Sequence, residues 1–90
     1  MTLTAVIVKL MPTSPEVNLK EIENSSKFAL EKHGAMNISF EQKPIAFGLK
    51  AILIKFAWPE ESGTDTIEAI LSKIKNVSSV RIEDYRRAFG

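Results

Sequence analysis

The residues that could carry out chemistry are few in this chain of 90 residues. His33 is the only histidine and there is no cysteine, so thiolate nucleophiles and thiolate metal sites are excluded. We expect His33 to lie at the end of a helix, where the helix dipole or solvent accounts for it. None of the serines stands in a glycine-flanked nucleophile elbow; they are Ser14, Ser25, Ser26, Ser39, Ser62, Ser72, Ser78 and Ser79. The sequence therefore argues against bond-making catalysis, and we expect that the protein is not an enzyme.

Metal-binding and phosphate-binding patterns are also missing from the sequence. The acidic pairs Glu60-Glu61 and Glu83-Asp84 lack the spacing of a calcium loop or of a two-helix metal site, so we interpret them as solvated surface charges. A phosphate-binding loop needs clustered glycines that lead into a helix. The glycines of this chain are scattered, at Gly34, Gly48, Gly63 and Gly90. We therefore expect no cofactor and no metal site.

The segment 44–50, Pro-Ile-Ala-Phe-Gly-Leu-Lys, separates two alternating apolar runs at a point where a turn is normally polar. A buried strand does not need a proline at its start and a glycine in its middle, and a simple turn does not need Ile45 and Phe47. One interpretation is that Phe47 binds a partner. The other is that Phe47 covers the local core over a bulge at Gly48. The composition alone leaves both interpretations open.

The end of the chain, residues 86–90, reads Arg-Arg-Ala-Phe-Gly and has the composition of an interface. An arginine side chain is able to bind a carboxylate through two hydrogen bonds. A frayed basic tail has the same composition, so this segment alone decides nothing. Together with the loop, it gives a set of candidate partner-binding residues: Pro44, Ile45, Phe47, Gly48, Arg86 and Arg87.

Four strands are predicted from alternating apolar residues. Residues 3–10 and 49–58 carry apolar side chains on both faces, as central strands do. Residues 36–41 alternate with polar residues and predict an edge strand. The fourth predicted strand covers residues 77–85.

Two amphipathic helices alternate with these strands. The first begins at Asn18 and Glu21, which resemble a capping box, and ends near Gly34. The second begins in the segment 62–65. Its apolar stripe consists of Ile67, Ile70, Leu71 and Ile74. The order β-α-β-β-α-β predicts an α+β fold, the ferredoxin-like sandwich, in which a four-stranded antiparallel sheet carries both helices on one face of a single domain, residues 1–90.

Composition and charge describe one soluble domain. The chain is 44% hydrophobic and 26% charged, and its formal net charge of +1 argues against the broad basic field of a nucleic-acid binder. The amino terminus lacks the basic start and the cleavage site of a signal peptide, and no run approaches the ~18 apolar residues of a membrane span. We therefore expect a cytoplasmic protein that does not contact membranes.

The same order of elements occurs in RNA-recognition modules, which stack bases on aromatic side chains of their two central strands. Strand 3–10 has no aromatic residue, and strand 49–58 offers only Phe56 and Trp58 near its end. We interpret Trp58 as a residue at the edge of the core or at a hydrophobic rim, and not as a base-stacking group. We therefore expect no direct binding of nucleic acid.

Several segments resemble the archaeal elongation factor 1-beta family. They are the loop 44–50, Lys-Leu-Met-Pro at 9–12, Val-Asn-Leu at 17–19, and Val-Arg-Ile-Glu-Asp at 80–84 followed by Arg86 and Arg87. The resemblance extends over nearly the whole chain, from Leu3 to Phe89, and the loop is its specific part.

Members of this family are guanine-nucleotide exchange factors for elongation factor 1-alpha, the GTPase that carries aminoacyl-tRNA to the ribosome. The resemblance implies that this chain binds that GTPase and weakens its hold on magnesium and on the nucleotide phosphates. It implies that Phe47 is the aromatic residue that packs on the GTPase near its nucleotide domain, in a loop shaped by Pro44, Ile45 and Gly48. The archaeal form is similar to the carboxyl-terminal catalytic domain of larger eukaryotic relatives.

Those eukaryotic relatives place a lysine near the carboxyl terminus that reaches toward the magnesium site of the GTPase. This chain has no lysine after Lys75 and carries Arg86 and Arg87 near its end. Because an arginine fork differs from a compact ammonium group, the resemblance leaves open which residue displaces magnesium.

Two other functions are compatible with the same fold. One is a ferredoxin-like regulatory module that pairs its sheets into a homodimer and binds a small metabolite at the interface. The other is binding of single-stranded RNA. An exchange factor is expected to be a monomer until it meets its GTPase, so the solution mass separates it from the homodimer.

Overall fold

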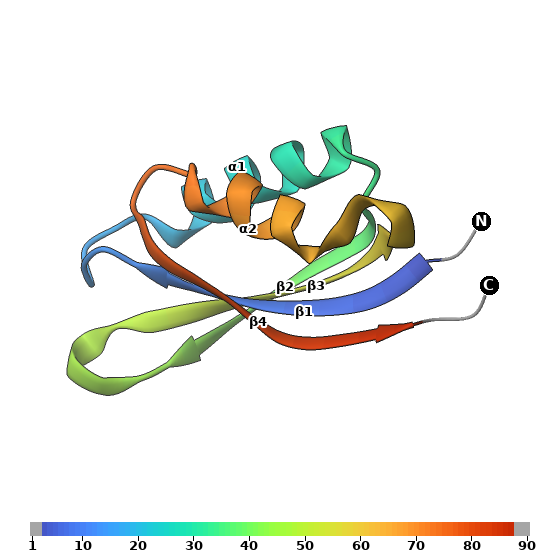
Figure 1. Ribbon diagram of the computed structural model, residues 1–90. Coiled ribbons are helices and arrows are strands. Elements are labelled where there is room, and N and C mark those ends of the chain that lie inside the picture. The colour runs from blue at the N-terminus through green and yellow to red at the C-terminus, as the bar shows by residue number, and fades with distance from the viewer. Residues whose placement is uncertain (1–2, 88–90) are drawn as a thin grey trace.

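The structure is a computed structural model that describes residues 3–87, with Arg87 described by its backbone only. The elements follow the order β-α-β-β-α-β, with a short 3₁₀ turn after β2 and another after β3 (Figure 1). They are β1 (Leu3–Pro12), α1 (Leu19–Lys32), β2 (Met36–Pro44), η1 (Ala46–Gly48), β3 (Lys50–Pro59), η2 (Glu60–Ser62), α2 (Gly63–Ser72) and β4 (Val77–Arg87).

The four strands form one antiparallel sheet in the order β2-β3-β1-β4, and both helices cover the same face of it (Figure 1). The central strands β1 and β3 come from the two segments that carry apolar residues on both faces, and β2 lies at an edge, as its alternation predicts. The predicted ferredoxin-like fold is therefore confirmed.

The core lies between the sheet and the helices. Alternate side chains of the central strands point toward the helices and are buried, among them Val6, Val8, Leu10, Ile52, Ile54 and Phe56. The helices contribute the buried side chains Ile22, Leu30, Ile67 and Leu71. This two-layer packing leaves the other face of the sheet open.

Trp58 lies inside the core, and the prediction that it sits at the core edge or at a rim is wrong. Its side chain is 0% exposed, and its ring meets that of Phe56 edge to face at a centroid distance of 5.8 Å. The indole Nε1 donates a hydrogen bond of 3.0 Å to the carbonyl oxygen of Gly63. That bond lets the ring be buried without an unpaired N–H and ties β3 to the start of α2.

Helix α1 begins and ends at the residues that the sequence indicates. The side chain of Asn18 accepts hydrogen bonds from the backbone N–H groups of Lys20 and Glu21, at 3.0 and 3.4 Å. The helix ends at Lys32, and Gly34 follows with φ of +98°, a conformation that suits glycine. No described helix is both long enough and apolar enough to cross a membrane.

The strands and α2 differ from the predicted ranges at their ends. β1 and β4 are both longer than predicted, because their pairing continues from Pro12 opposite Val77 to Thr4 opposite Arg87. Helix α2 ends at Ser72, so Ile74 packs against the core from beyond the helix. Strand formation in these segments follows the partner strand rather than local alternation.

The start of β2 contains an irregularity that its alternation of apolar and polar residues does not predict. Met36 pairs with Ala57, the register then shifts before Ser39, and Asn37 has φ of +57°. The irregularity turns Met36 outward, so that its side chain is 47% exposed and does not join the apolar stripe of Ile38 and Phe40.

Candidate partner-binding site

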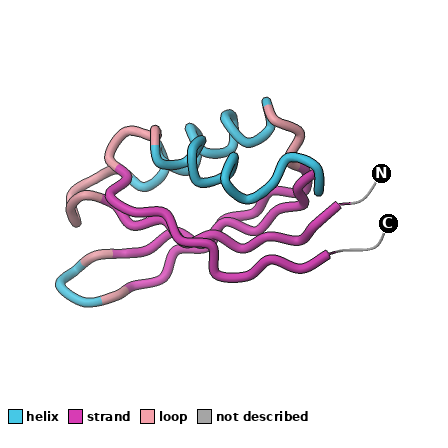
Figure 2. The backbone as a smooth tube through the Cα atoms, viewed as in Figure 1, coloured by secondary structure: helices cyan, strands magenta, loops and turns pink. Residues whose placement is uncertain are grey.

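The hairpin between β2 and β3 projects beyond the two-layer body, at the end of the molecule opposite the start of β1 and the end of β4 (Figure 1). A short helical turn, η1, forms its tip (Figure 2). The backbone N–H of Ile45 donates to the carbonyl oxygen of Leu49 at 2.8 Å, and that of Leu49 donates to Ala46 at 3.2 Å. The tip is therefore held by its own backbone rather than by contacts with the core.

Phe47 lies at the tip in an unusual conformation. Its φ and ψ are 62° and 30°, the left-handed region that bulky L-residues rarely adopt. Its side chain is 93% exposed. The interpretation that Phe47 covers the local core is therefore wrong: a disfavoured backbone conformation holds a large aromatic ring in solvent, which is typical of functional positions.

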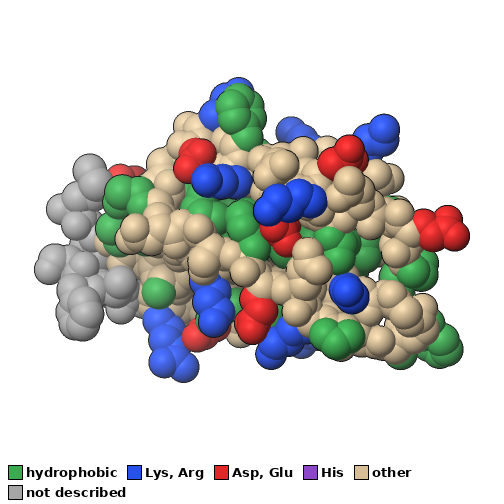
Figure 3. All heavy atoms as spheres, turned by 180° about the vertical axis from the view of Figure 1, so that it is seen from behind, with side chains coloured by type: hydrophobic (Ala, Val, Ile, Leu, Met, Phe, Trp, Pro, Cys, Tyr) green, Lys and Arg blue, Asp and Glu red, His purple; other side chains and the backbone are tan. Residues whose placement is uncertain are grey.

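The residues around Phe47 make the hairpin tip apolar with basic flanks. Pro44, Ile45 and Gly48 are all exposed beside the ring, and Ile45 keeps 37% of its surface in solvent. Hydrophobic side chains are visible at the lower right of Figure 3, where the hairpin lies in that view. Lys50 is the exposed cation next to the tip on β3. A surface of this kind fits an apolar cleft in a partner protein.

The structure does not bring Arg86 and Arg87 to this site. Arg86 pairs with Ala5 and Arg87 with Thr4 in the sheet, at the end where β1 begins (Figure 1). Thr4 is also opposite Trp58, and the stretch of β3 from Lys50 to Trp58 spans roughly 26 Å at ~3.3 Å per residue. The two groups of candidate residues thus occupy opposite ends of a body whose longest extent is 41 Å.

Arg86 is held by a neighbouring carboxylate. Its Nε lies 3.0 Å from Oδ2 of Asp84, and the side chains of the two are 79% and 36% exposed. A second pair of the same kind joins Arg81 to Glu83 at 3.3 Å, again with the arginine 79% exposed. Glu83 and Asp84 on β4 are therefore each paired with an arginine, and their side chains also remain partly exposed to solvent. Exposed pairs of this type contribute little to stability.

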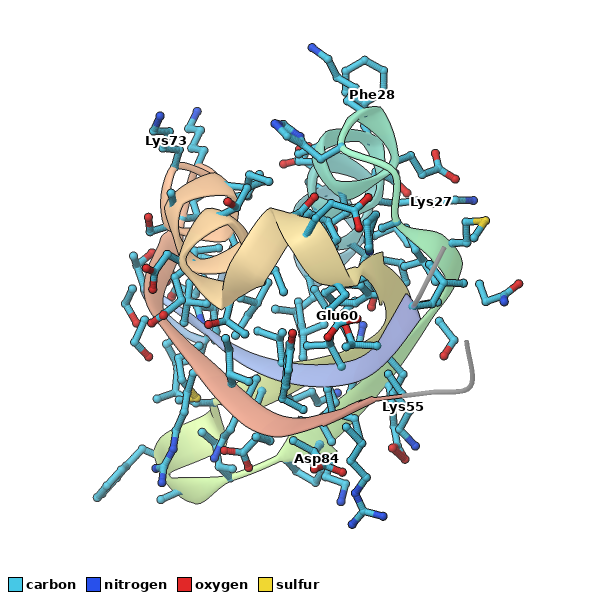
Figure 4. All side chains as sticks on the ribbon, turned by 45° about the vertical axis from the view of Figure 1, so that its right-hand side comes forward. Lys27, Phe28, Lys55, Glu60, Lys73 and Asp84 are labelled. Carbon is cyan, nitrogen blue, oxygen red and sulfur yellow. The ribbon has the colours of Figure 1, made fainter. Side chains whose placement is uncertain are left out.

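In the described residues, the open face of β1 and β3 carries aliphatic and charged side chains rather than aromatic ones. Asp84 of β4 is opposite Ile7 of β1, which is opposite Lys55 of β3, and Figure 4 shows Lys55 and Asp84 on the side of the sheet away from the helices. The aromatic residues of β3, Phe56 and Trp58, are buried under the helices instead. They do not form a base-stacking platform.

The structure assigns no chemical role to His33 or to the acidic side chains within residues 3–87. His33 lies just after α1, and its Nδ1 is 3.0 Å from the carbonyl oxygen of Ala29. Within residues 3–87, no cluster of three or more His, Asp or Glu side chains is arranged to bind a metal ion.

The sequence analysis did not predict two features of the surface. Phe28 on α1 is 67% exposed, with Nζ of Lys32 5.4 Å from its ring centroid, and it points away from the sheet (Figure 4). The helical pattern could have predicted this exposure, because Phe28 falls outside the apolar stripe of its helix. The second is the loop between β1 and α1, whose Pro15 approaches Gly48 of the hairpin. No local pattern reveals that approach.

Comparison with known proteins identifies the family. Residues 5–88 match the model of the EF-1 guanine nucleotide exchange domain. The chain belongs to this family. It is 40% identical to elongation factor 1-beta of Methanocella arvoryzae over 83 residues, 91% of this chain and 92% of that protein. It is 42% identical to elongation factor 1-beta of Methanocaldococcus jannaschii over 74 residues, 81% and 83% of the two chains. Elongation factor 1-beta of Thermococcus kodakarensis is 37% identical over 84 residues, 90% of each chain.

The resemblance to archaeal elongation factor 1-beta is thus confirmed, and with it the function of a guanine-nucleotide exchange factor in translation elongation. An exchange domain acts by binding another protein, which agrees with a projecting apolar hairpin. The residues that make that contact are not given by family membership and need their own argument.

Proposed function

We propose that this domain binds elongation factor 1-alpha through the Phe47 hairpin and the carboxyl-terminal end of the sheet, and that binding stabilises a form of the GTPase with a weakened hold on magnesium and GDP. No covalent step is involved. GDP leaves, GTP enters because it is abundant, and the exchange factor dissociates.

The observation that carries the proposal is the conformation of Phe47. Its ring is 93% exposed at φ of 62°, so the chain bears both a conformational and a solvation cost at this one residue. Both costs are offset when a partner encloses the ring. An aromatic side chain buried at the centre of an interface commonly contributes ~2 kcal/mol or more.

The energy that exchange requires is compatible with such an interface. Linkage demands that the factor bind the nucleotide-free GTPase more tightly than the GDP-bound form, by the same ratio by which it weakens GDP. A thousandfold weakening corresponds to about 4 kcal/mol of differential binding. One buried aromatic ring and a few charge-assisted contacts supply that amount.

The second contact in the proposal is the end of β4. Arg86 and Arg87 lie in the part of this chain where eukaryotic relatives carry the lysine directed at the magnesium site. Because the hairpin and this end are far apart, the GTPase must extend along the length of the domain to touch both. Arg86 already pairs with Asp84, so an acidic group of the GTPase has to compete with that exposed carboxylate.

Release of a fluorescent GDP analogue from elongation factor 1-alpha tests the role of the hairpin. We expect Phe47→Ala to slow the catalysed release by at least about tenfold, which corresponds to 1.4 kcal/mol. Phe28→Ala is the matched control, because it removes another exposed aromatic ring from the helical face. Equal release rates with the native protein and Phe47→Ala would remove Phe47 from the mechanism.

The arginine end has its own test. Replacing Arg86 and Arg87 with alanine should slow association with the GTPase and flatten its dependence on salt concentration, because exposed charges steer docking. Arg81→Ala is the control, since Arg81 has the same exposure and the same kind of carboxylate partner elsewhere on β4. Unchanged association at every salt concentration would show that the terminal arginines are passive.

The remaining parts of the proposal concern the oligomeric state of the domain, its location and its binding of nucleic acid. We propose that the domain is a monomer when free, works in the cytoplasm and does not bind nucleic acid directly. Solution mass and titration with single-stranded RNA at physiological salt test these points. A dimer that holds a small metabolite between its sheets would contradict the first.

A further inference from the structure

The hairpin leaves the body of the sheet at a single rung. The pairing of β1 with β3 ends at Leu10 opposite Ile52, whereas the pairing of β2 with β3 continues to Lys50. Residues 43–51 therefore form a two-stranded ribbon that runs on past the other strands (Figure 1). We call this segment the hairpin ribbon, and Phe47 lies at its tip. Two strands alone hold their shape less firmly than a larger sheet, so the ribbon needs support at its base.

Gln42 stands at the base of the hairpin ribbon, on the helix-facing side of β2. It is opposite Ile52, which is 0% exposed beneath the helices. Two residues earlier, Phe40 is opposite Ile54 on the same side and packs against the core. An apolar side chain at position 42 would continue that packing, so the glutamine calls for a reason of its own.

The side chain of Gln42 is bonded to Glu23 of α1. Its Nε2 donates a hydrogen bond of 3.0 Å to Oε2 of Glu23, a residue that is only 9% exposed. In the described residues, this is the one side-chain hydrogen bond or ion pair that joins residues 42–50 to another element. The loop before α1 also approaches the ribbon, but at Gly48, which has no side chain to interlock with it.

A hydrogen bond at this rung restricts the orientation of the ribbon in a way that an apolar contact does not. Its strength falls steeply with misalignment, whereas hydrophobic contact has no preferred direction. A carboxylate that is nearly buried also loses stability when its donor moves away, because little water can replace that donor. The pair therefore favours the one orientation of the ribbon in which Gln42 meets Glu23.

We infer that Glu23 and Gln42 are positioning residues for nucleotide exchange: their hydrogen bond holds the hairpin ribbon in the orientation in which Phe47 docks on elongation factor 1-alpha. The inference rests on the proposed function. A partner that binds one orientation selects it from the population, so the apparent affinity falls in proportion to the fraction of molecules in that orientation. Both residues act through Phe47.

Glu23→Met tests the inference. Methionine resembles glutamate in length and is also a good helix former, but its thioether is a weak acceptor. Gln42 is exposed, so water hydrates the amide that is set free. We expect the KM of the catalysed exchange for the GTPase to rise about three- to tenfold with kcat unchanged. The Tm should not fall, because an apolar side chain replaces a nearly buried charge.

Two control variants separate the hydrogen bond from the charge. Glu23→Gln removes the charge but keeps an amide oxygen that accepts from Gln42, so its KM should match that of the native protein. Glu31→Met removes a carboxylate from an exposed position of the same helix and should also leave the KM unchanged. A KM raised as much by either control as by Glu23→Met would overturn the inference.

A double-mutant cycle with Phe47→Ala shows whether the pair acts through the ring. In the Phe47→Ala background, Glu23→Met should raise the KM less than about twofold, because the ring that the pair positions is gone. A rise by the same factor in both backgrounds would mean that the pair acts on another part of the domain, and the inference would be wrong.

The outcomes also separate this inference from the proposed function. If Phe47→Ala slows exchange and Glu23→Met leaves the KM unchanged, the pair does not position the ribbon, and the proposed function stands. If neither variant changes exchange, the proposed function itself fails. A thermal melt of each variant confirms folding, and Gln42→Leu breaks the same hydrogen bond from the other side if Glu23→Met unfolds.

Discussion

Replacing Phe47 with asparagine should make the free protein more stable and the exchange factor less active. Asparagine adopts the left-handed region more readily than phenylalanine, because its short polar side chain forms local hydrogen bonds there. The phenylalanine ring is 93% exposed, so its removal costs few packing contacts. The substitution relieves a strained backbone and leaves the core as it was.

The magnitude follows from the conformation. A non-glycine residue in the left-handed region costs ~1–2 kcal/mol, and asparagine recovers part of that. We therefore expect Phe47→Asn to raise the free energy of unfolding by about 1 kcal/mol. For a domain of this size such a change raises the Tm by roughly 4–8 °C.

Thermal unfolding followed by circular dichroism measures this effect, with Phe28→Asn as the control. Phe28 has ordinary helical surroundings in α1 and contacts Lys32, so asparagine there should lower the Tm. Catalysed exchange should be slowed by at least about tenfold in Phe47→Asn and unchanged in Phe28→Asn. If both variants lower the Tm alike, the left-handed backbone of Phe47 carries no strain and the reasoning is refuted.

Two further substitutions test contacts at the end of β3 that lies away from the hairpin. Gly34→Ala should lower the free energy of unfolding, measured in urea, by about 1–2 kcal/mol. Alanine is disfavoured at φ of +98°, and its Cβ would lie 3.2 Å from Cγ of Pro59. An unchanged unfolding midpoint would contradict this expectation. Trp58→Phe should lower the free energy of unfolding by about 2 kcal/mol, because it removes the hydrogen bond to the carbonyl of Gly63 and leaves a cavity in the core. A loss below ~0.5 kcal/mol would show that neither the bond nor the packing of the indole ring contributes.

The sequence was sufficient for the sheet order because the two central strands carry apolar side chains on both faces, whereas the predicted edge strand carries them on one face. Packing decides which face of β1 meets the helices: Val6, Val8 and Leu10 are buried there, whereas Ala5 is exposed. The exposure of Met36 was not readable, because it depends on a register shift that local alternation does not encode. The same holds for Trp58, whose full burial depends on a carbonyl supplied by the start of α2.

The conformation of Phe47 also could not be predicted, because local propensity argues against it. Phenylalanine rarely adopts the left-handed region, and here the hairpin closure between Ile45 and Leu49 imposes it. The sequence therefore left two interpretations of the ring, and only its exposure decides between them. Sequence reasoning failed at the residue where the chain departs from its local preference, which is where functional residues concentrate.

The separation of the two candidate contacts, in contrast, follows from the predicted topology. β3 and β4 both run antiparallel to β1, so they run in the same direction. The hairpin precedes β3 and the arginines end β4, so the two must lie at opposite ends of the sheet. Continuous strands with a packed core join these ends, and close packing leaves the distance between them little room to vary. In the proposed complex, docking of Phe47 therefore fixes where Arg86 lies on the GTPase, and the second contact forms as an intramolecular step with less entropy to lose.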